Sequence, residues 1–202
     1  MKVALIGATG RVGSRLAAEL VSRGHVVTGI ARHVPADAPP GVTFVQADTN
    51  DPEALAQSLR GHDAVISAMR FATSDADTLI AAVKRAGVKS LLVVGGAGSL
   101  EVAPGKALID TEGFPEAFRA EASAGSRFLA RLRAEPDLDW TFLSPSANFA
   151  PGERTGRFRL GDDQLLTDAD GKSHISMEDF AIAMVDELER PAHNRRRFTV
   201  GY

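Results

Sequence analysis

The sequence predicts an α/β protein built on a doubly wound parallel sheet, and three observations support this prediction. Short apolar runs alternate with helical patterns of about 10–15 residues along the 202-residue chain. A glycine-rich turn joins the first apolar run to the first helical pattern. No repeat, long linker or low-complexity segment interrupts the alternation. Because crossovers between parallel strands are right-handed, the helices are expected on both faces of the sheet.

Seven strands are expected, each a short run of apolar and β-branched residues. We expect the order 3-2-1-4-5-6-7 across the sheet, with ligands over the carboxyl ends of strands 1 and 4. A hairpin around Gly161-Asp162 is expected between Arg157 and Leu166. The expected strands are residues 2–6, 26–30, 42–45, 64–66, 91–94, 140–143 and 198–200.

The helices are predicted from apolar positions three or four residues apart and from their capping residues. Asp51, Pro52 and Glu53 have the typical order of a helix start: a cap, a first-turn proline and an acidic residue near the positive end of the dipole. Gly87 is expected to end one helix, and Ser176 to cap another. The expected helices follow the glycine turn and cover about 51–60, 75–85, 116–134 and 176–189.

Composition narrows the class of protein. The hydrophobic fraction of 44% suffices for a full core, and no stretch approaches the ~20 apolar residues of a membrane span. Cysteine is absent, which excludes disulfides and thiolate chemistry. The net charge of −3 gives no general attraction to nucleic acid or an anionic membrane, and Arg195–Arg197 is the only basic run. No two histidines have helical metal-ligand spacing, so no metal site is expected.

These features predict one domain over residues 1–202, in which residues 145–180 form a small substrate-side segment. The chain starts with a strand, which leaves no room for a signal peptide, so a cytoplasmic protein is expected. We expect a monomer or homodimer that binds a small-molecule substrate and neither nucleic acid nor membrane.

The turn Gly7-Ala-Thr-Gly10-Arg-Val-Gly13 predicts a dinucleotide site, because it lies between a strand and a helix. The first glycine permits a tight turn, the second lets phosphates approach the backbone, and the third lets helix and strand pack closely. Unpaired N–H groups at the helix start then face the pyrophosphate. Thr9, Arg11 and Val12 belong to the same turn and are expected to contact the cofactor.

The residues after the second strand predict which cofactor binds. About twenty residues past the glycines, an NAD enzyme usually has Asp or Glu on the ribose hydroxyls. This chain has Arg32 and His33 there. A carboxylate would repel a 2′-phosphate, whereas a guanidinium pairs with one. NADP(H) is therefore predicted over NAD(H), the alternative being that Arg32 is a surface arginine at a strand end.

The loops after the other strands are expected to complete the cofactor site, since carboxyl ends of parallel strands meet at one edge. Asp48 could accept a hydrogen bond from the adenine amine, or could simply cap a helix. Small residues after the later strands would let the backbone approach the ribose, the nicotinamide and its carboxamide. These residues are Ser67, Ala68, Met69, Gly95, Gly96, Ser144, Pro145 and Ser146.

Over essentially its whole length the chain resembles the atypical short-chain dehydrogenase/reductases, near the NmrA-like NAD(P)-binding proteins and the biliverdin reductase B/flavin reductase group. The resemblance implies a Rossmann fold. It is carried by the glycine turn, Arg32, Gln46-Ala-Asp48, Ser67-Ala68, Val94-Gly-Gly-Ala97, Asp139-Trp-Thr-Phe-Leu-Ser-Pro145 and Ile175-Ser-x-Glu-Asp179. In one respect the chain departs from this superfamily, whose active site uses a Tyr-x-x-x-Lys pair. Tyr202 is the only tyrosine here, and residues 107–135 contain no lysine.

The missing pair argues against ordinary alcohol–ketone chemistry. Hydride transfer to a flavin, quinone or tetrapyrrole needs no such tyrosine, because solvent can protonate the acceptor, and the protein then mainly positions flat rings. Ser99, where the resemblance places the family's serine, and His174, before the last helix, are the candidate catalytic residues. The candidate substrate-binding residues, which could equally be ordinary packing residues, are Arg70, Phe71, Phe114, Phe118 and Phe149.

Three functions remain open at this point. The first is an NADPH-dependent reductase of a planar or carbonyl acceptor. The second is a non-catalytic NAD(P) sensor of the NmrA-like type; the missing pair favours it, but no appended partner-binding domain is visible. The third is a nucleotide-sugar epimerase or dehydratase, which would also need the tyrosine and a larger substrate domain.

Overall fold

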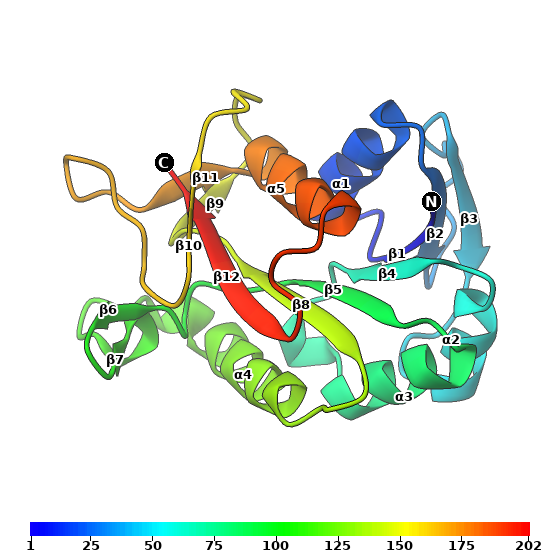
Figure 1. Cartoon of the computed structure of the whole chain (residues 1–202), viewed down its shortest axis with the longest axis horizontal. Helices are drawn as coiled ribbons and strands as arrows, with labels where there is room; N and C mark the ends of the chain where they lie inside the picture. Colours follow the sequence, from blue (N-terminus) through cyan, green and yellow to red (C-terminus); the bar gives the residue numbers. More distant parts are fainter.

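An eight-stranded sheet runs through the computed structural model, which describes residues 1–202 (Figure 1). The expected strand order is confirmed, and one further strand, β10, is added at the edge beside β12. From one edge to the other the strands are β3 (Val42–Gln46), β2 (Val26–Ala31), β1 (Lys2–Ile6), β4 (Ala64–Ser67), β5 (Ser90–Val94), β8 (Asp139–Ser144), β12 (Arg196–Gly201) and β10 (Arg159–Gly161).

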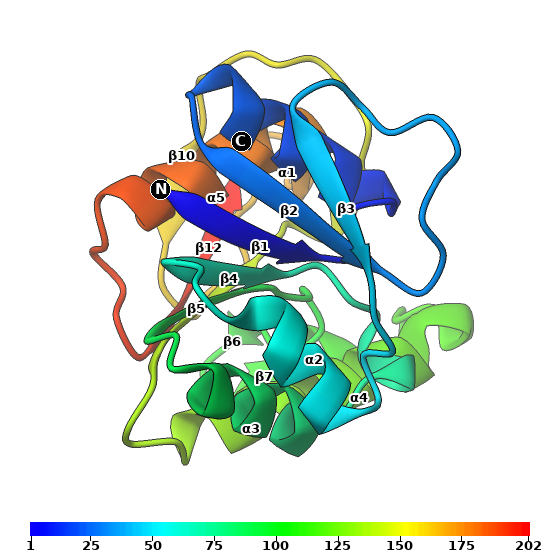
Figure 2. The same ribbon diagram turned by 90° about the vertical axis from the view of Figure 1, so that its right-hand side faces the viewer.

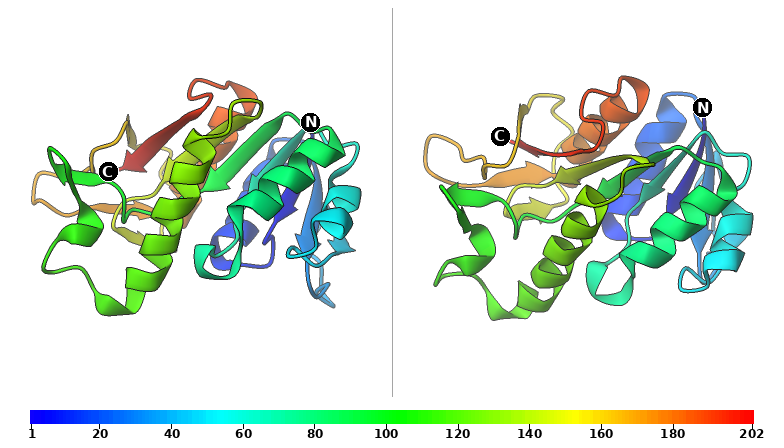
Figure 3. Two further views of the ribbon diagram at one scale, coloured as in Figure 1. Left: turned by 90° about the horizontal axis from the view of Figure 1, so that it is seen from below. Right: turned by 60° about the horizontal axis from the view of Figure 1, so that its bottom comes forward.

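Helices cover both faces of this sheet, as expected for a doubly wound fold (Figure 2). Two helices that pack on each other cover one face: α1 (Arg11–Ser22) and α5 (Met177–Glu189). Three helices cover the other face, with α3 between its neighbours (Figure 3): α2 (Pro52–Leu59), α3 (Ala76–Ala86) and α4 (Glu116–Arg133).

Alternation along the strands divides the core into two clusters, because successive side chains point to opposite faces. In β5, Leu91 and Val93 pack beneath α3 and α4, whereas Leu92 and Val94 pack beneath α1 and α5. Phe142 and Leu143 of β8 divide in the same way. Burying each such side chain contributes roughly 1.5–3 kcal/mol.

The predicted caps are confirmed. Asp51 accepts hydrogen bonds from the backbone of Glu53 at 2.9 Å and Ala54 at 3.2 Å. Ser176 Oγ accepts from the backbone N of Asp179 at 3.0 Å. Gly87 ends α3 with a φ of 76°, a left-handed conformation that glycine adopts without strain. Each of these helix ends is therefore determined by residues that lie within a few positions of one another in the sequence.

The expected hairpin between Arg157 and Leu166 is wrong. Leu160 of β10 pairs with Val200 of β12 in antiparallel fashion, and Gln164 instead bridges to Glu101. An alternating pattern indicates a strand but does not specify its partner. β12 pairs with β8 on one side only, so its other edge is available to β10.

Two small sheets lie beyond the carboxyl ends of the main strands. One is a parallel pair, β9 (Asn148–Ala150) with β11 (His174–Ser176). The other is an antiparallel pair, β6 (Glu101–Ala103) with β7 (Lys106–Ala107).

Candidate dinucleotide site and adjoining pocket

The glycine turn after β1 has the backbone geometry that a close approach to phosphate requires. Gly7 has a φ of 81°, and a Cβ there would lie 2.8 Å from the carbonyl oxygen of Ala68. A Cβ on Gly13 would lie 2.0 Å from the carbonyl oxygen of Gly7. Gly7 therefore shapes the turn against β4, and Gly13 lets α1 pack directly on it.

The start of α1 presents unpaired backbone donors. Gly10 caps the helix without a side-chain hydrogen bond, and the first bond into the helix runs from Ser14 N to Gly10 O at 2.9 Å. The N–H groups of Arg11, Val12 and Gly13 consequently have no acceptor in the protein. Together with the positive end of the helix dipole, they form an anion-binding site suited to a pyrophosphate.

A cavity of about 270 Å³ extends from this turn over the ends of β1, β2 and β4, and we call it the cradle. Of the residues expected to contact the cofactor it brings together Gly7, Thr9, Gly10, Arg32, Ala68 and Met69, whereas Arg11, Val12 and Gly13 do not line it. Thr49 and Asn50 also line it, although no motif marked them in the sequence. The lining residues are Ile6, Gly7, Thr9, Gly10, Ile30, Ala31, Arg32, Thr49, Asn50, Ala68, Met69, Arg70, Thr73 and Ser74.

Arg32 lines the cradle with a guanidinium that has no acidic partner within salt-bridge distance. Its carbonyl oxygen accepts a hydrogen bond from Gln46 Nε2 at 3.0 Å, which fixes the backbone at the end of β2. His33 is exposed and does not line the cradle. Asp48 does not line it either, because its carboxylate accepts from Asn50 N at 2.9 Å within its own turn.

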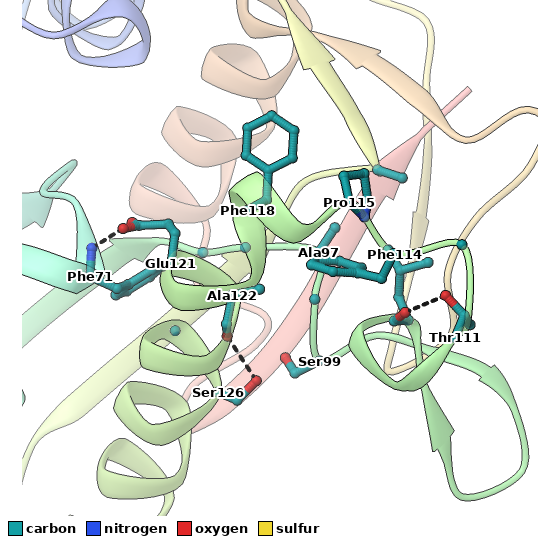
Figure 4. Close-up of a pocket in the computed structure, with 17 residues that line it drawn as sticks. Phe71, Ala97, Ser99, Thr111, Phe114, Pro115, Phe118, Glu121, Ala122 and Ser126 are labelled. Carbon is teal, nitrogen blue, oxygen red and sulfur yellow. Dashed lines mark hydrogen bonds between the residues drawn. The ribbon is translucent and has the colours of Figure 1, made fainter.

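A second cavity, of about 440 Å³, lies between the end of β5 and the start of α4, and we call it the apolar pocket (Figure 4). Glycine backbone and phenylalanine rings form much of its wall. The lining residues are Phe71, Gly95, Gly96, Ala97, Gly98, Ser99, Leu108, Thr111, Gly113, Phe114, Pro115, Phe118, Glu121, Ala122, Gly125, Ser126 and Ala147.

The two expected glycines after β5 have different roles. A Cβ on Gly95 would lie 2.4 Å from the ring of Phe142, so this glycine is required by strand packing. A Cβ on Gly96 would have no neighbour closer than Phe71 at 3.8 Å. Gly96 is therefore a position at which the backbone faces open space in the pocket, as is Gly113, where a Cβ would have no neighbour within 4 Å.

The expected aromatic residues do not all reach the apolar pocket. Phe118 is 63% exposed at its rim, and Phe114 lies beneath the Arg119 guanidinium, 5.5 Å from the ring centroid. Phe71 is mostly core, with its ring centroid 5.2 Å from that of Phe128. Phe149 does not line the pocket: it packs against the core cluster beneath α5, with its ring centroid 4.8 Å from that of Phe180.

Glu121 of α4, which sequence reasoning missed, fixes the segment between the two cavities. Its carboxylate accepts a hydrogen bond from the backbone N of Phe71 at 2.6 Å (Figure 4) and another from that of Ala72 at 3.0 Å. Arg70 Nε lies 3.9 Å from the same carboxylate. Arg70 itself lines the cradle and not the apolar pocket.

Ser99 has a charged partner that the sequence did not indicate. Arg197 of β12 donates from Nη1 to Ser99 Oγ at 3.3 Å and from Nη2 to the Ser99 carbonyl oxygen at 3.4 Å. The same Nη1 lies 3.5 Å from Ser144 Oγ, which is fully buried. Ser99 is therefore in the pocket wall, whereas Ser144 lies behind it.

The residues that follow Ser144 also point into the protein interior and not into the pocket. Pro145 and Ser146 are buried, and Ser146 Oγ donates to the Val200 carbonyl oxygen at 3.0 Å. Only Ala147 of this segment reaches the apolar pocket. Ser67, at the end of β4, is also buried and lines neither cavity.

His174, the other candidate catalytic residue, does not lie in the same cavity as Ser99. It lines another cavity, of about 320 Å³, and its Nδ1 lies 3.6 Å from an Asp168 carboxylate oxygen. Tyr202 borders the same cavity, and its hydroxyl donates to Asp179 at 2.7 Å. Burial, reinforced by this bond, raises the pKa of Tyr202. Neither residue lines the cradle or the apolar pocket.

The sheet order, the glycine turn and the unpaired helix N-terminus define a Rossmann-type dinucleotide-binding protein. The chain belongs to the NAD(P)H-binding family, whose model matches residues 7–191. This membership agrees with the resemblance described above and supports a nicotinamide dinucleotide as the ligand. No helix has the length and apolar character needed to cross a membrane.

Three solved structures are similar to the chain over its entire length. A Burkholderia pseudomallei protein, provisionally named as exported, is 48% identical with a TM-score of 0.92, and all of it is covered. A Bacteroides thetaiotaomicron protein, provisionally named an epimerase, is 43% identical with a TM-score of 0.94 and 96% covered. A Streptococcus pneumoniae protein, provisionally named an NADH-flavin reductase, is 37% identical with a TM-score of 0.85 and 99% covered.

Proposed function

We propose that this protein is an NADPH-dependent oxidoreductase whose acceptor is a small planar molecule such as a flavin or quinone. The observation that carries the proposal is the adjacency of the two cavities. Met69 and Arg70 line the cradle, and Phe71, the next residue, lines the apolar pocket. A dinucleotide held by the glycine turn and extended along this segment would bring its nicotinamide to the pocket.

The residues of the cradle fit NADPH. The glycine turn and the N–H groups at the start of α1 would bind the pyrophosphate, and the unpaired Arg32 guanidinium would pair with the 2′-phosphate. The open backbone at Gly96 would let a flat ring approach. When bound, NADPH supplies the hydride. We also propose a cytoplasmic location, where NADPH is available.

The residues of the apolar pocket favour a planar acceptor. Phe114 and Phe118 supply flat apolar surface at its mouth, and the glycines leave room for a ring beside the backbone. Such walls position a ring and exclude water, and they supply no tyrosine for proton donation. The name of the Streptococcus pneumoniae relative agrees with a flavin acceptor.

Two other functions have weaker support. The name of the Bacteroides thetaiotaomicron relative favours an epimerase, but no tyrosine lines the cradle or the apolar pocket of this chain. The absence of a Tyr-x-x-x-Lys pair favours a redox sensor. A sensor, however, does not need a pocket of about 440 Å³ beside its dinucleotide cradle.

The test is a parallel fluorescence titration of the purified protein with NADPH and NADH, followed by assays of NADPH oxidation with flavins and quinones. We expect tighter binding of NADPH and turnover with at least one of these acceptors. Binding without turnover of any flavin or quinone would favour the sensor. Binding of neither dinucleotide would overturn the assignment of the cradle.

A further inference from the structure

We propose that a third cavity, of about 510 Å³, binds the phosphate group of a small phosphorylated molecule. It lies between the end of α4, the segment after β10 and the start of β12 (Figure 1). It shares no lining residue with the cradle or the apolar pocket, so the proposal does not depend on the proposed function. We call it the arginine cavity, and its lining residues are Arg133, Trp140, Asp162, Asp163, Gln164, Arg195, Arg196 and Arg197.

The charges on the wall of the arginine cavity have a positive excess. Four arginines and two aspartates line it, which leaves two positive charges unbalanced among the lining residues. Asp163 is shared between Arg197 and Arg133, whose Nη2 lies 3.3 Å from Asp163 Oδ1. Asp162 is exposed and forms no ion pair with any of the arginines. A ligand with two negative charges would therefore offset the excess.

Arg195 and Arg196 have guanidinium donors that a ligand can use. Arg196 is exposed and forms no ion pair. Arg195 Nη2 lies 3.5 Å from Asp139 Oδ1, which is long for a hydrogen bond, and the Arg195 side chain is 50% exposed. A guanidinium presents its donors as a planar fork that matches the oxygens of a phosphate, so two neighbouring forks suit a group with several charged oxygens.

The backbone at Arg195 is held in an unusual conformation. Its φ is 56°, the only positive value in the chain at a residue other than glycine. The backbone N of Arg195 donates to the Trp140 carbonyl oxygen at 2.7 Å, which fixes this conformation just before β12 begins. Successive side chains of a regular strand point to opposite faces, and the left-handed turn departs from that alternation. All three arginines of the basic run consequently line one cavity.

Trp140 provides a second, independent observation. Its side chain is buried, with 2% of the residue exposed, and its Nε1 is the one buried side-chain polar atom without a hydrogen-bond partner. An indole N–H can only donate, and a buried one is costly to leave unpaired. Because Trp140 belongs to the wall of the arginine cavity, a phosphate oxygen bound against this wall would supply the acceptor.

The shape of the site favours a small molecule over a nucleic acid. Nucleic acids are bound by basic residues spread along a surface, whereas these arginines converge on one cavity of a size typical for small ligands. The net charge of −3 gives the chain no general attraction to a polyanion. A phosphate monoester carries about 1.5 to 2 negative charges at neutral pH, which matches the local excess.

The test uses the single tryptophan of the chain as its reporter. Protein labelled with heavy nitrogen has one indole N–H resonance, which is followed during titration with glycerol 3-phosphate and, separately, with glycerol. We expect a saturable downfield shift with the phosphate, because a hydrogen bond to a charged oxygen deshields the indole proton. Glycerol has no charged group and should cause no shift.

Substitutions on the rim of the cavity should weaken this binding. Arg195→Gln and Arg196→Gln should each raise the dissociation constant of glycerol 3-phosphate about tenfold, because each removes a charged hydrogen bond. Arg196→Lys retains the charge without the fork and should have a smaller effect. Arg60→Gln, at an exposed arginine outside the cavity, is the matched control and should leave the constant unchanged.

Gly10→Val separates the arginine cavity from the glycine turn, which could also bind phosphate. This variant has a blocked cradle and should show the same indole shift as the wild type. An indole resonance that does not move, an unchanged constant in both Arg195→Gln and Arg196→Gln, or loss of the shift in Gly10→Val would each overturn the inference. A shift caused only by RNA or only by vesicles containing phosphatidic acid would overturn the assignment to a small molecule. Failure of NADPH to bind would overturn the proposed function and leave this site standing.

Discussion

Glu121 Oε1 lies 2.6 Å from the backbone N of Phe71, and this hydrogen bond joins α4 to the segment that separates the cradle from the apolar pocket. Phe71 in turn packs against Phe128 and Phe142. One carboxylate thus fixes the point where the chain passes from the wall of the cradle, at Arg70, to the wall of the apolar pocket, at Phe71. Its removal should affect stability as well as binding.

Glu121→Ala should lower the free energy of unfolding by about 1–3 kcal/mol, because it leaves two backbone N–H groups without their acceptor. Glu121→Gln retains one acceptor oxygen and should cost less. Urea denaturation measures both variants. Glu116→Gln, an exposed partner of Arg119, is the control and should change stability by no more than about 0.5 kcal/mol. Equal effects at positions 116 and 121 would contradict the anchoring role.

Arg32→Ala should raise the dissociation constant for NADPH about 10- to 100-fold, the equivalent of about 1.5–3 kcal/mol for a charged hydrogen bond. The dissociation constant for NADH should change little, since NADH has no 2′-phosphate. Parallel fluorescence titrations measure both. Arg60→Ala, an exposed arginine outside the cradle, is the control. An equal loss for both dinucleotides would exclude the 2′-phosphate role.

Two glycines of the turn should respond differently to substitution. Gly13→Ala places a Cβ 2.0 Å from the Gly7 carbonyl oxygen, so it should destabilise the fold by about 1–3 kcal/mol. Gly10→Val should mainly abolish dinucleotide binding, because a Cβ there lies 3.2 Å from its nearest neighbour and larger groups block the cradle. Thermal unfolding with and without NADPH separates the two effects. A Gly10→Val protein that NADPH still stabilises would place the pyrophosphate elsewhere.

Phe118→Ala should raise the KM for the acceptor about fivefold, the equivalent of about 1 kcal/mol of aromatic contact, without lowering stability. The ring is 63% exposed, so little burial is lost in the free protein. Phe149→Ala is the contrasting variant: its ring packs on Phe180, so stability should fall while KM stays constant. Steady-state kinetics and urea denaturation of both variants make the comparison, and the opposite pattern would refute the placement of the two rings.

The ion pairs of Glu19 should make the stability of the fold depend on pH in the acid range. Burial alone would raise the pKa of this carboxyl, but hydrogen bonds from Arg154 and Arg23 outweigh it, so the pKa lies below its ordinary value of 4.5. A carboxyl with a lowered pKa stabilises the fold fully above that ordinary value and loses its contribution as the pH falls through the lowered pKa. The stability difference between wild type and Glu19→Gln should therefore shrink below pH 4.5. A constant difference down to pH 2 would contradict this assignment.

The sequence predicts what local chemistry determines. The caps at Asp51 and Ser176 and the turn at Gly7 depend on residues close in the chain, and each was found as expected. The Arg197–Ser99 contact could not be predicted, because it joins residues 98 positions apart through the packing of β12 beside β8. The placement of Phe149 could not be predicted for a related reason, because the direction of its ring depends on the pairing of β9 with β11.

The cradle and the apolar pocket have no lining residue in common. Substitutions that alter one wall therefore leave the other unchanged, apart from the boundary held by Glu121. During evolution, dinucleotide preference and acceptor preference can drift separately in a protein built this way. Under the proposed function, homologues with the same cradle residues could thus differ in their acceptors, and identity at those residues would report on the nucleotide alone.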